Sequence, residues 1–371
     1  MAVYLVRTRP RQKRTLVWGV LAASFAVMMF GFALRSGRVA SLASPLLPGD
    51  SGAWVRAALF AWTVLSIGWA AAFAVERILA ARGRRAKLAE ANDPGPTRRG
   101  FLAAARGAMF AAPATALGFG IIERGAIGLR EHDIPVPGLP PDLHGLRIVQ
   151  ITDIHMSPFF SRRELDRAVA MANETRAHIA LVTGDLITSR RDPLDDCLRG
   201  LKPLRADAGV FGCMGNHEKF TGLQDYTEQA GARQGLRFLR DASLMLPFGS
   251  SRLNLAGVDY QPMRGPYLPG AERMIVPGAY NVLLSHNPDV FDVAARQGYD
   301  LTISGHTHGG QVRVEILGAD LNVARFFTPY VDGLYRQDRA SIFVSRGLGT
   351  IGIPARLGAP PEVTLLRLCR T

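Results

Sequence analysis

The sequence has few cysteines, and their spacing excludes two kinds of small scaffold. Only Cys197, Cys213 and Cys369 occur in 371 residues, and no two of them form a C-x-x-C pair. An odd, widely spaced set supports neither a disulfide framework nor a zinc ribbon, so we expect these residues to serve as small buried apolar side chains. A G-x-S-x-G nucleophile motif is also absent. Residues 347–352 match G-x-G-x-x-G, but Ile353-Pro354 follows and prevents the helix that a dinucleotide fingerprint requires.

Acidic residues are scarce in one part of the chain only. The first 106 residues carry 16 Lys and Arg against four Asp and Glu, so 12 of the 13 net positive charges lie there. The remaining 265 residues, with 28 basic and 27 acidic side chains, are close to neutral. A nucleic-acid-binding domain carries the basic surplus on its own surface. This distribution therefore argues against nucleic acid as a partner and for a membrane near the N-terminal part.

The same N-terminal part contains long runs without charge. Residues 15–34 and 57–75 are uncharged, and each has about the length that a helix needs to cross a bilayer. A third, weakly apolar segment at 101–122 follows Arg98-Arg99, in a context that resembles a twin-arginine export signal. Residues 1–122 are therefore predicted to form a membrane region, in which the third segment spans the bilayer, is cleaved, or lies in the interface.

The distribution of basic residues around these runs predicts the topology. Five Lys and Arg precede the first run and seven lie between residues 77 and 99, whereas the loop between the first two runs has three. Cytoplasmic loops are enriched in Lys and Arg. Three crossings of an inner membrane would therefore place the chain from residue 123 onward on the periplasmic side. If the third segment lies in the interface, that part of the chain faces the cytoplasm instead.

From residue 145 the pattern becomes that of a globular α/β domain. Residues 123–144 contain four prolines and are predicted to form a linker, because proline cannot sustain a regular helix. Across 145–371, strands first alternate with helices and then follow one another directly, which favours two packed mixed β-sheets flanked by helices. We expect strands at 146–152, 178–183, 209–214, 253–258, 281–285, 300–304, 311–314, 341–345 and 362–368, and helices at 161–176 and 192–204.

Residues that can bind a metal ion follow five of these strands. Ligands bind outside the carboxyl ends of strands in such sheets, and five of the chain's eight histidines fall at these points. Imidazole and carboxylate ligands without a thiolate suit Mn, Fe, Zn, Co or Ni. The set is too large for one such ion and suits two divalent ions that share a carboxylate. Its members are Asp153, His155, Asp185, Asn216, His217, Glu218, His286, His306 and His308.

Taken in order, Asp-x-His, Gly-Asp, Gly-Asn-His-Glu, His and Gly-His-x-His resemble the motifs of the calcineurin-like metallophosphoesterase superfamily. The resemblance covers about residues 142–371, and the tail at 345–362 is similar to that of a bacterial, membrane-associated phosphodiesterase subgroup. It implies that His217 faces the phosphate as a catalytic residue and that Glu218 orients its neighbours. It also implies two sets of metal ligands that share Asp185: Asp153, His155, Asp185 and His308 for one ion, and Asp185, Asn216, His286 and His306 for the other.

The resemblance implies a membrane-anchored, dinuclear-metal-dependent phosphoesterase. Its substrate would be a phosphorylated small molecule or a lipid, with a phosphodiester or pyrophosphate attacked in line by a metal-bound hydroxide. One alternative is a cytoplasm-facing UDP-2,3-diacylglucosamine hydrolase of lipid A synthesis. Another is a non-catalytic envelope protein that keeps the fold as a binding scaffold.

Overall fold

The computed structural model describes residues 96–316 and 319–371, together with scattered positions between 54 and 78. The predicted span at 15–34 lies outside the described residues, as does most of the run at 57–75. The third predicted segment lies within helix α5 (Pro96–Glu123), which is 28 residues long and contains Pro113. Among the described residues, no helix combines the length and the apolar character needed to cross a membrane. The chain divides into two compact units, Met1–Phe119 and Gly120–Thr371.

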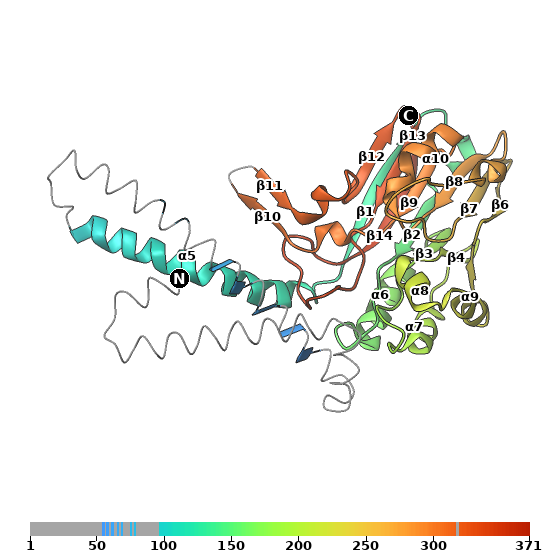
Figure 1. Cartoon of the computed structure of the whole chain (residues 1–371). Helices are drawn as coiled ribbons and strands as arrows, with labels where there is room; N and C mark the ends of the chain where they lie inside the picture. The colour runs from blue at the N-terminus through green and yellow to red at the C-terminus, as the bar shows by residue number, and fades with distance from the viewer. Residues whose placement is uncertain are drawn as a thin grey trace. The chain divides into compact units, whose positions relative to one another are not determined.

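Two six-stranded sheets make up most of the second unit (Figure 1). The first sheet contains, in spatial order, β1 (Gly128–Val136), β14 (Glu362–Arg370), β2 (Arg147–Ile151), β3 (Ile179–Thr183), β4 (Val210–Cys213) and β5 (Leu236–Phe238). The second contains β12 (Gly333–Gln337), β13 (Ala340–Val344), β9 (Leu301–Ser304), β8 (Tyr280–Leu284), β7 (Ser251–Gly257) and β6 (Ala242–Phe248). A separate hairpin consists of β10 (Arg313–Ile316) and β11 (Ala319–Asn322).

Both sheets are mixed, as predicted. In the first, β2, β3, β4 and β5 run parallel, whereas β14 is antiparallel to β2. In the second, β7, β8, β9 and β13 run parallel, and antiparallel strands β6 and β12 form the edges. The parallel strands of each sheet therefore end on the same side, which brings the segments that follow them together.

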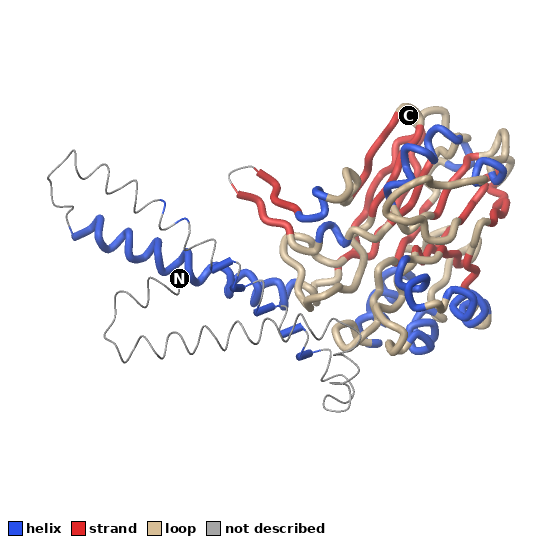
Figure 2. The backbone as a smooth tube through the Cα atoms, in the orientation of Figure 1, coloured by secondary structure: helices blue, strands red, loops and turns tan. Residues whose placement is uncertain are grey.

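The sheets pack face to face, with helices on their outer faces (Figure 2). Alternation along β2 shows this arrangement, because successive strand residues point to opposite faces. Ile148 lies in the core between the sheets with Val282 of the second sheet. Val149 packs on the other side with Leu165 of α6 (Arg162–Glu174) and Leu198 of α7 (Leu194–Leu201). The predicted architecture of two mixed sheets flanked by helices is confirmed.

Short helices complete the unit. The outer face of the second sheet is covered in part by α10 (Phe291–Gln297), whose Ala294 packs with Leu283. The others are α8 (Asn216–Thr221), α9 (Gln224–Ala232), and the 3-10 helices η1 (Pro141–Leu143), η2 (Ala271–Met274), η3 (Pro288–Val290), η4 (His308–Gly310) and η5 (Val323–Phe326).

The segment predicted as a linker, 123–144, is instead part of the fold. It contains β1, which pairs in parallel with β14 and forms one edge of the first sheet. Pro135 lies inside this strand and is tolerated because an edge strand leaves one row of N–H groups without a ladder partner. The prolines excluded a regular α-helix, although Pro141 begins the 3-10 helix η1, and they did not exclude an edge strand.

Candidate metal centre

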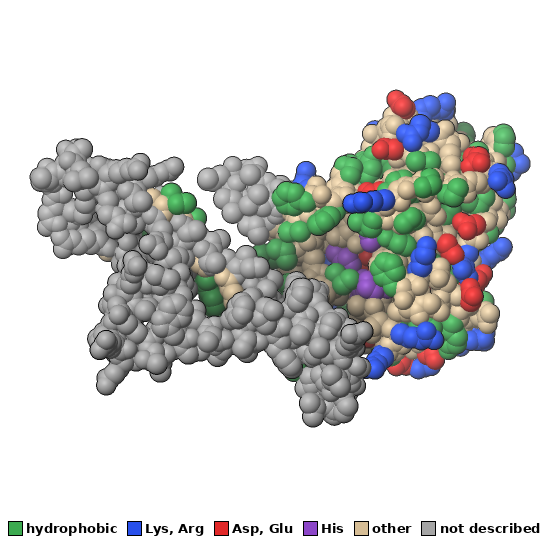
Figure 3. Space-filling model, in the orientation of Figure 1, with side chains coloured by type: hydrophobic (Ala, Val, Ile, Leu, Met, Phe, Trp, Pro, Cys, Tyr) green, Lys and Arg blue, Asp and Glu red, His purple; other side chains and the backbone are tan. Residues whose placement is uncertain are grey.

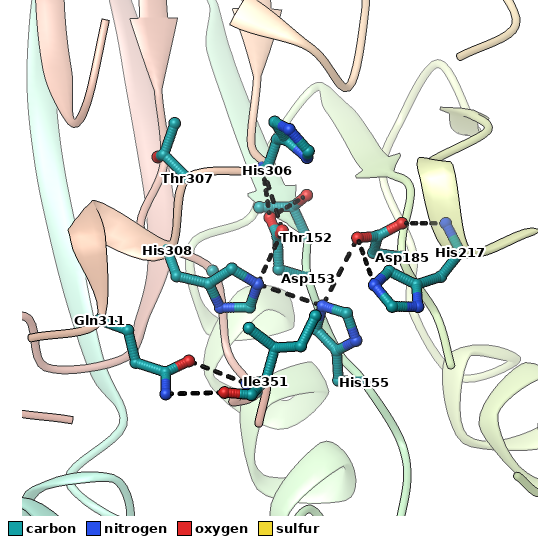
Figure 4. Close-up of polar contacts among 12 residues, drawn as sticks. Thr152, Asp153, His155, Asp185, His217, His306, Thr307, His308, Gln311 and Ile351 are labelled. Carbon is teal, nitrogen blue, oxygen red and sulfur yellow. Dashed lines mark hydrogen bonds and ion pairs between the residues drawn. The ribbon is translucent and has the colours of Figure 1, made fainter. Parts of the chain in front are cut away.

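The polar residues predicted from the sequence meet at the carboxyl ends of the strands. Figure 4 shows side chains from both sheets pointing toward one another. The ligand atoms form three groups, and within each group the atoms lie within 4.8 Å of one another. They are Asp153, His155 and His308; His155, Asp185 and His217; and Asp185, His286 and His306. The first group holds three of the four ligands predicted for one ion, and the third holds three of the four predicted for the other. Asp185 belongs to the second and third groups.

Close side-chain contacts within the site join ligands both across the two sheets and within the first sheet. Nε2 of His155 lies 3.1 Å from Nε2 of His308. Oδ2 of Asp185 lies 3.1 Å from Nε2 of His286 and 3.5 Å from Nε2 of His155. Asp185 is therefore placed between the histidines of the two groups. Asp153, His155 and His286 have no exposed surface, so their charges are shielded from water.

Backbone geometry explains why these motifs contain glycine. A Cβ atom at Gly215 would overlap Oδ1 of Asp185, and one at Gly305 would overlap Oδ2 of Asp153. Only a residue without a side chain lets the backbone approach the carboxylates this closely.

Many of the predicted ligands hold an uncommon backbone conformation. Their φ angles range from 46° to 76°, in the left-handed region that non-glycine residues rarely adopt. Strain of this kind persists where the surrounding structure fixes it, and it clusters at functional sites. The residues are Asp153, His155, Asp185, His306 and His308.

Thr188 holds two of the histidines, and no sequence motif indicated it. Its carbonyl accepts from Nδ1 of His217 at 2.6 Å, and its Oγ1 lies 3.0 Å from Nδ1 of His155. Thr188 is itself fixed by Asp192, whose Oδ2 accepts from the Thr188 N–H at 2.9 Å. Asp192 thus fixes the loop at the start of the helix predicted at 192–204, and α7 begins after Pro193 without a side-chain cap.

Hydrogen bonds to carbonyls also fix which ring nitrogen carries the proton. Nδ1 of His286 lies 2.7 Å from the Thr183 carbonyl, which can only accept, so Nδ1 is the protonated nitrogen. The same argument applies to His217 and the Thr188 carbonyl. In the neutral form of each ring, the Nε2 lone pair is therefore free for a cation or a substrate proton.

Glu218 stabilises the backbone next to the predicted ligands. Its two carboxylate oxygens accept from the N–H groups of Asp185, Leu186 and Gly215 at 2.9, 2.8 and 2.8 Å. This fully buried side chain ties the turn after β3 to the start of α8. The expectation that it orients its neighbours agrees with this geometry.

Glu218→Gln is expected to lower the free energy of unfolding by about 1–3 kcal/mol, because one carboxylate oxygen becomes an NH₂ group that faces a backbone donor. Thermal unfolding of the full chain measures this. Glu131→Gln, on the exposed side of β1, is the matched control and should change stability by less than about 0.5 kcal/mol. Equal stability of the two variants would contradict the supporting role.

Burial dominates the electrostatics of the site. It lowers the pKa of His155 to about 3 and that of His306 to about 4. Burial also raises the pKa of Asp153 to about 6, with a contribution from Asp185 against the lowering effect of His286. Burial alone would raise the pKa of Asp185, but His286, with its neighbouring imidazoles, holds it below its usual range. Neutral imidazoles beside an ionised carboxylate are the protonation states that metal ligands require.

Two buried atoms indicate where cations fit. Among the described residues, Oδ1 of Asn216 and Nε2 of His286 have no hydrogen-bond partner, although the latter makes the ion-pair contact with Asp185. An unpaired buried polar atom is costly, and a cation would satisfy both. Burial would lower the pKa of His286, yet Asp185 and Asp153 raise it to about 10. The carboxylates thus attract positive charge to the place where the second ligand set predicts a metal ion.

Arg356 is the largest fully buried side chain, and sequence reasoning did not single it out. Its Nη2 lies 3.2 Å from Nδ1 of His308, and its Nη1 donates to the carbonyl of the same residue at 3.3 Å. Further bonds run to the carbonyls of Gly349, Ala359 and Arg346. Burial lowers the pKa of its guanidinium to about 10, so the group stays charged behind His308.

A comparison with known proteins finds a family that matches the part of the chain with these ligands. The family model of calcineurin-like phosphoesterases matches residues 146–310, which include all the predicted ligands. Residues 146–310 are thus similar to calcineurin-like phosphoesterases. The match begins at β2 and ends just after His308, so Arg356 and β14 lie beyond it.

Proteins similar to this chain occur in animals and bacteria. A "Transmembrane protein with metallophosphoesterase domain" of Danio rerio is 32% identical over 62% of this chain and 55% of its own length. The metallophosphoesterase YkuE of Bacillus subtilis is 29% identical over 74% of this chain and 98% of its own length. The Escherichia coli "Phosphodiesterase YaeI" is 28% identical over 73% of this chain and 99% of its own length. The chain thus matches only about half of the length of the Danio rerio protein.

Proposed function

We propose that the chain is a dinuclear-metal-dependent phosphoesterase that hydrolyses a phosphodiester or pyrophosphate. The observation that carries this proposal is the position of Asp185, whose carboxylate lies between two groups of buried imidazoles. One carboxylate shared between two ligand sets is what a two-metal site for phosphoryl displacement requires.

Each side chain has a defined part in this proposal. Asp153, His155, Asp185 and His308 hold one ion, and Asp185, Asn216, His286 and His306 hold the other. The ions would supply positive charge for the phosphoryl oxygens and lower the pKa of the attacking water. Burial keeps His155, His306 and His308 neutral. Thr188, Thr183 and Arg356 fix the direction of the imidazoles that they contact.

In this proposal His217 acts on the substrate rather than on a metal ion. Its Nε2 lies 4.0 Å from Oδ2 of Asp185, farther than Nε2 of His155 or His286. The Thr188 carbonyl aims this nitrogen into the site. There the imidazolium form, with protons on both ring nitrogens, can donate to a phosphoryl oxygen as charge develops, or deliver a proton to the leaving oxygen.

Chelation is expected to abolish hydrolysis of bis-p-nitrophenyl phosphate by the full chain, and Mn²⁺ should restore it. Elemental analysis of the restored protein should find about two ions per chain. His308→Asn should reduce both the bound metal and the activity, whereas His144→Asn, an exposed histidine near the end of β14, should change neither. Full activity after complete chelation, or equal behaviour of the two variants, would reject the proposal.

We further propose that the substrate is a lipid or another envelope component and that the chain is anchored in the inner membrane with the domain on the periplasmic side. The uncharged runs at 15–34 and 57–75, with their basic flanks, support the anchor. The name of the Danio rerio relative describes a transmembrane protein carrying this domain.

A reporter fused after residue 371 tests the orientation. An alkaline phosphatase fusion should be active and a cytoplasm-dependent fluorescent fusion should not, because three crossings place the domain outside. The opposite pair of signals would show a cytoplasmic domain. It would also favour the UDP-2,3-diacylglucosamine hydrolase alternative, which needs a site facing the cytoplasm.

A further inference from the structure

Large apolar side chains are exposed on both sides of the metal centre. Phe220 and Met263 are 71% and 47% exposed, and Val323, Phe326 and Phe327 are 56%, 86% and 69% exposed. Figure 3 shows hydrophobic side chains gathered around the histidines on this face. We call these five residues the apolar rim. Soluble surfaces rarely leave so many large apolar groups exposed near one another unless they bind something.

The first part of the apolar rim touches the site itself. Sδ of Met263 lies 3.3 Å from Nε2 of His306. The ring of Phe220 lies 6.0 Å from that of His217, and the ring of Tyr260 lies 6.1 Å from Phe220 and 5.8 Å from His306. A substrate substituent that extends from the metal centre on this side would therefore contact apolar side chains.

The second part is held firmly beside the turn that carries His308. Asn322 is buried, and its Nδ2 donates to the Gly309 carbonyl at 3.0 Å. Its Oδ1 accepts from the N–H of Ala324 at 3.0 Å and begins η5. The side chains of η5 and Phe327 are thus presented by a fixed segment next to a ligand.

The extent and composition of the apolar rim indicate which kind of molecule can bind there. A nucleobase or a sugar could cover one exposed ring, but it could not cover residues on both sides of the centre. Exposed Arg325 lies between the apolar residues of η5, and a mixture of aromatic and basic side chains suits an anionic lipid interface. The same chain carries two predicted membrane spans, which would hold the domain beside a bilayer.

We propose that the apolar rim docks on a lipid bilayer and that the substrate is an amphiphilic phosphoester drawn from it. The docking surface follows from the exposed side chains alone, whereas the substrate class rests on the proposed phosphoesterase function. The phosphoryl group would reach the metal centre while the acyl or alkyl chain stays on the apolar rim and in the bilayer.

Fluorescence quenching tests the docking surface without reference to activity. The full chain is reconstituted into phosphatidylglycerol–phosphatidylcholine vesicles that contain brominated lipid. The tryptophan added by Phe326→Trp should lose fluorescence relative to the wild-type background. That added by Tyr226→Trp, on exposed α9 away from the ligands, should not. Equal quenching of the two variants, or no quenching of either, would overturn the docking surface.

Two esters with the same leaving group test the substrate class. With Mn²⁺, the wild type should hydrolyse p-nitrophenyl hexadecyl phosphate in vesicles in preference to soluble p-nitrophenyl ethyl phosphate. The double variant Phe326→Ser/Phe327→Ser should lower this preference by roughly tenfold, because two large apolar contacts are lost, whereas Tyr226→Ser should not. An unchanged preference would overturn the substrate class. Failure of the wild type to hydrolyse either ester would instead reject the phosphoesterase function and leave the quenching result to decide the docking surface.

Discussion

Asp185→Asn is expected to reduce hydrolysis of bis-p-nitrophenyl phosphate by at least about a thousandfold, more than the loss of a single charge-stabilising donor costs. Oδ2 of Asp185 lies near His155 and His286, and Oδ1 accepts from the N–H of His217 at 2.9 Å. An amide presents only one oxygen and no negative charge. It therefore cannot hold two ligand sets together.

The substitution conserves shape, so the fold should be retained while metal binding falls. Elemental analysis should find fewer than two ions per chain, and thermal unfolding in the presence of a chelator should be close to that of the wild type. Asp133→Asn, which removes an exposed partner of Arg367, is the matched control and should leave activity and metal content unchanged. Retention of wild-type activity by the Asp185 variant would show that the shared carboxylate is not needed.

Arg356→Met is expected to have the largest effect on stability. The substitution leaves the buried carbonyls of His308, Gly349 and Ala359 without their guanidinium donor. Each unsatisfied buried group costs about 1–3 kcal/mol, so we expect a loss of at least about 3 kcal/mol. For a domain of this size that lowers the midpoint of thermal unfolding by roughly 6–12 °C.

The same substitution should weaken metal binding, because the ring of His308 loses the group behind it. Arg367→Met is the matched control, since Arg367 is exposed and pairs with Asp133 on the surface, where ion pairs contribute about 0–1 kcal/mol. Arg356→Lys should not rescue the midpoint, because one ammonium group cannot reach three carbonyls. Similar midpoints for Arg356→Met and Arg367→Met would contradict the assigned role.

Features encoded within a few residues were predictable. The helix predicted at 161–176 is present as α6, and a capping box begins it, with Ser161 N–H donating to Glu164 at 2.7 Å. The fully buried strands β2, β3 and β9 were visible as short apolar runs. The edge strand β1 was not, because its burial and pairing depend on β14, more than 200 residues away.

The sequence by itself determined the chemistry of the centre: which side chains can bind metal, and that each follows a strand. This is possible because a ligand directly after a buried strand is carried to the sheet's carboxyl edge by local structure alone. The tertiary structure decided which ligands meet. His306 and His308 lie two residues apart, yet His306 joins Asp185 and His286 while His308 joins Asp153 and His155. It also decided that Thr188, Glu218 and Arg356 hold them and that the apolar rim surrounds them, because these contacts join segments whose separation in the chain carries no local signal.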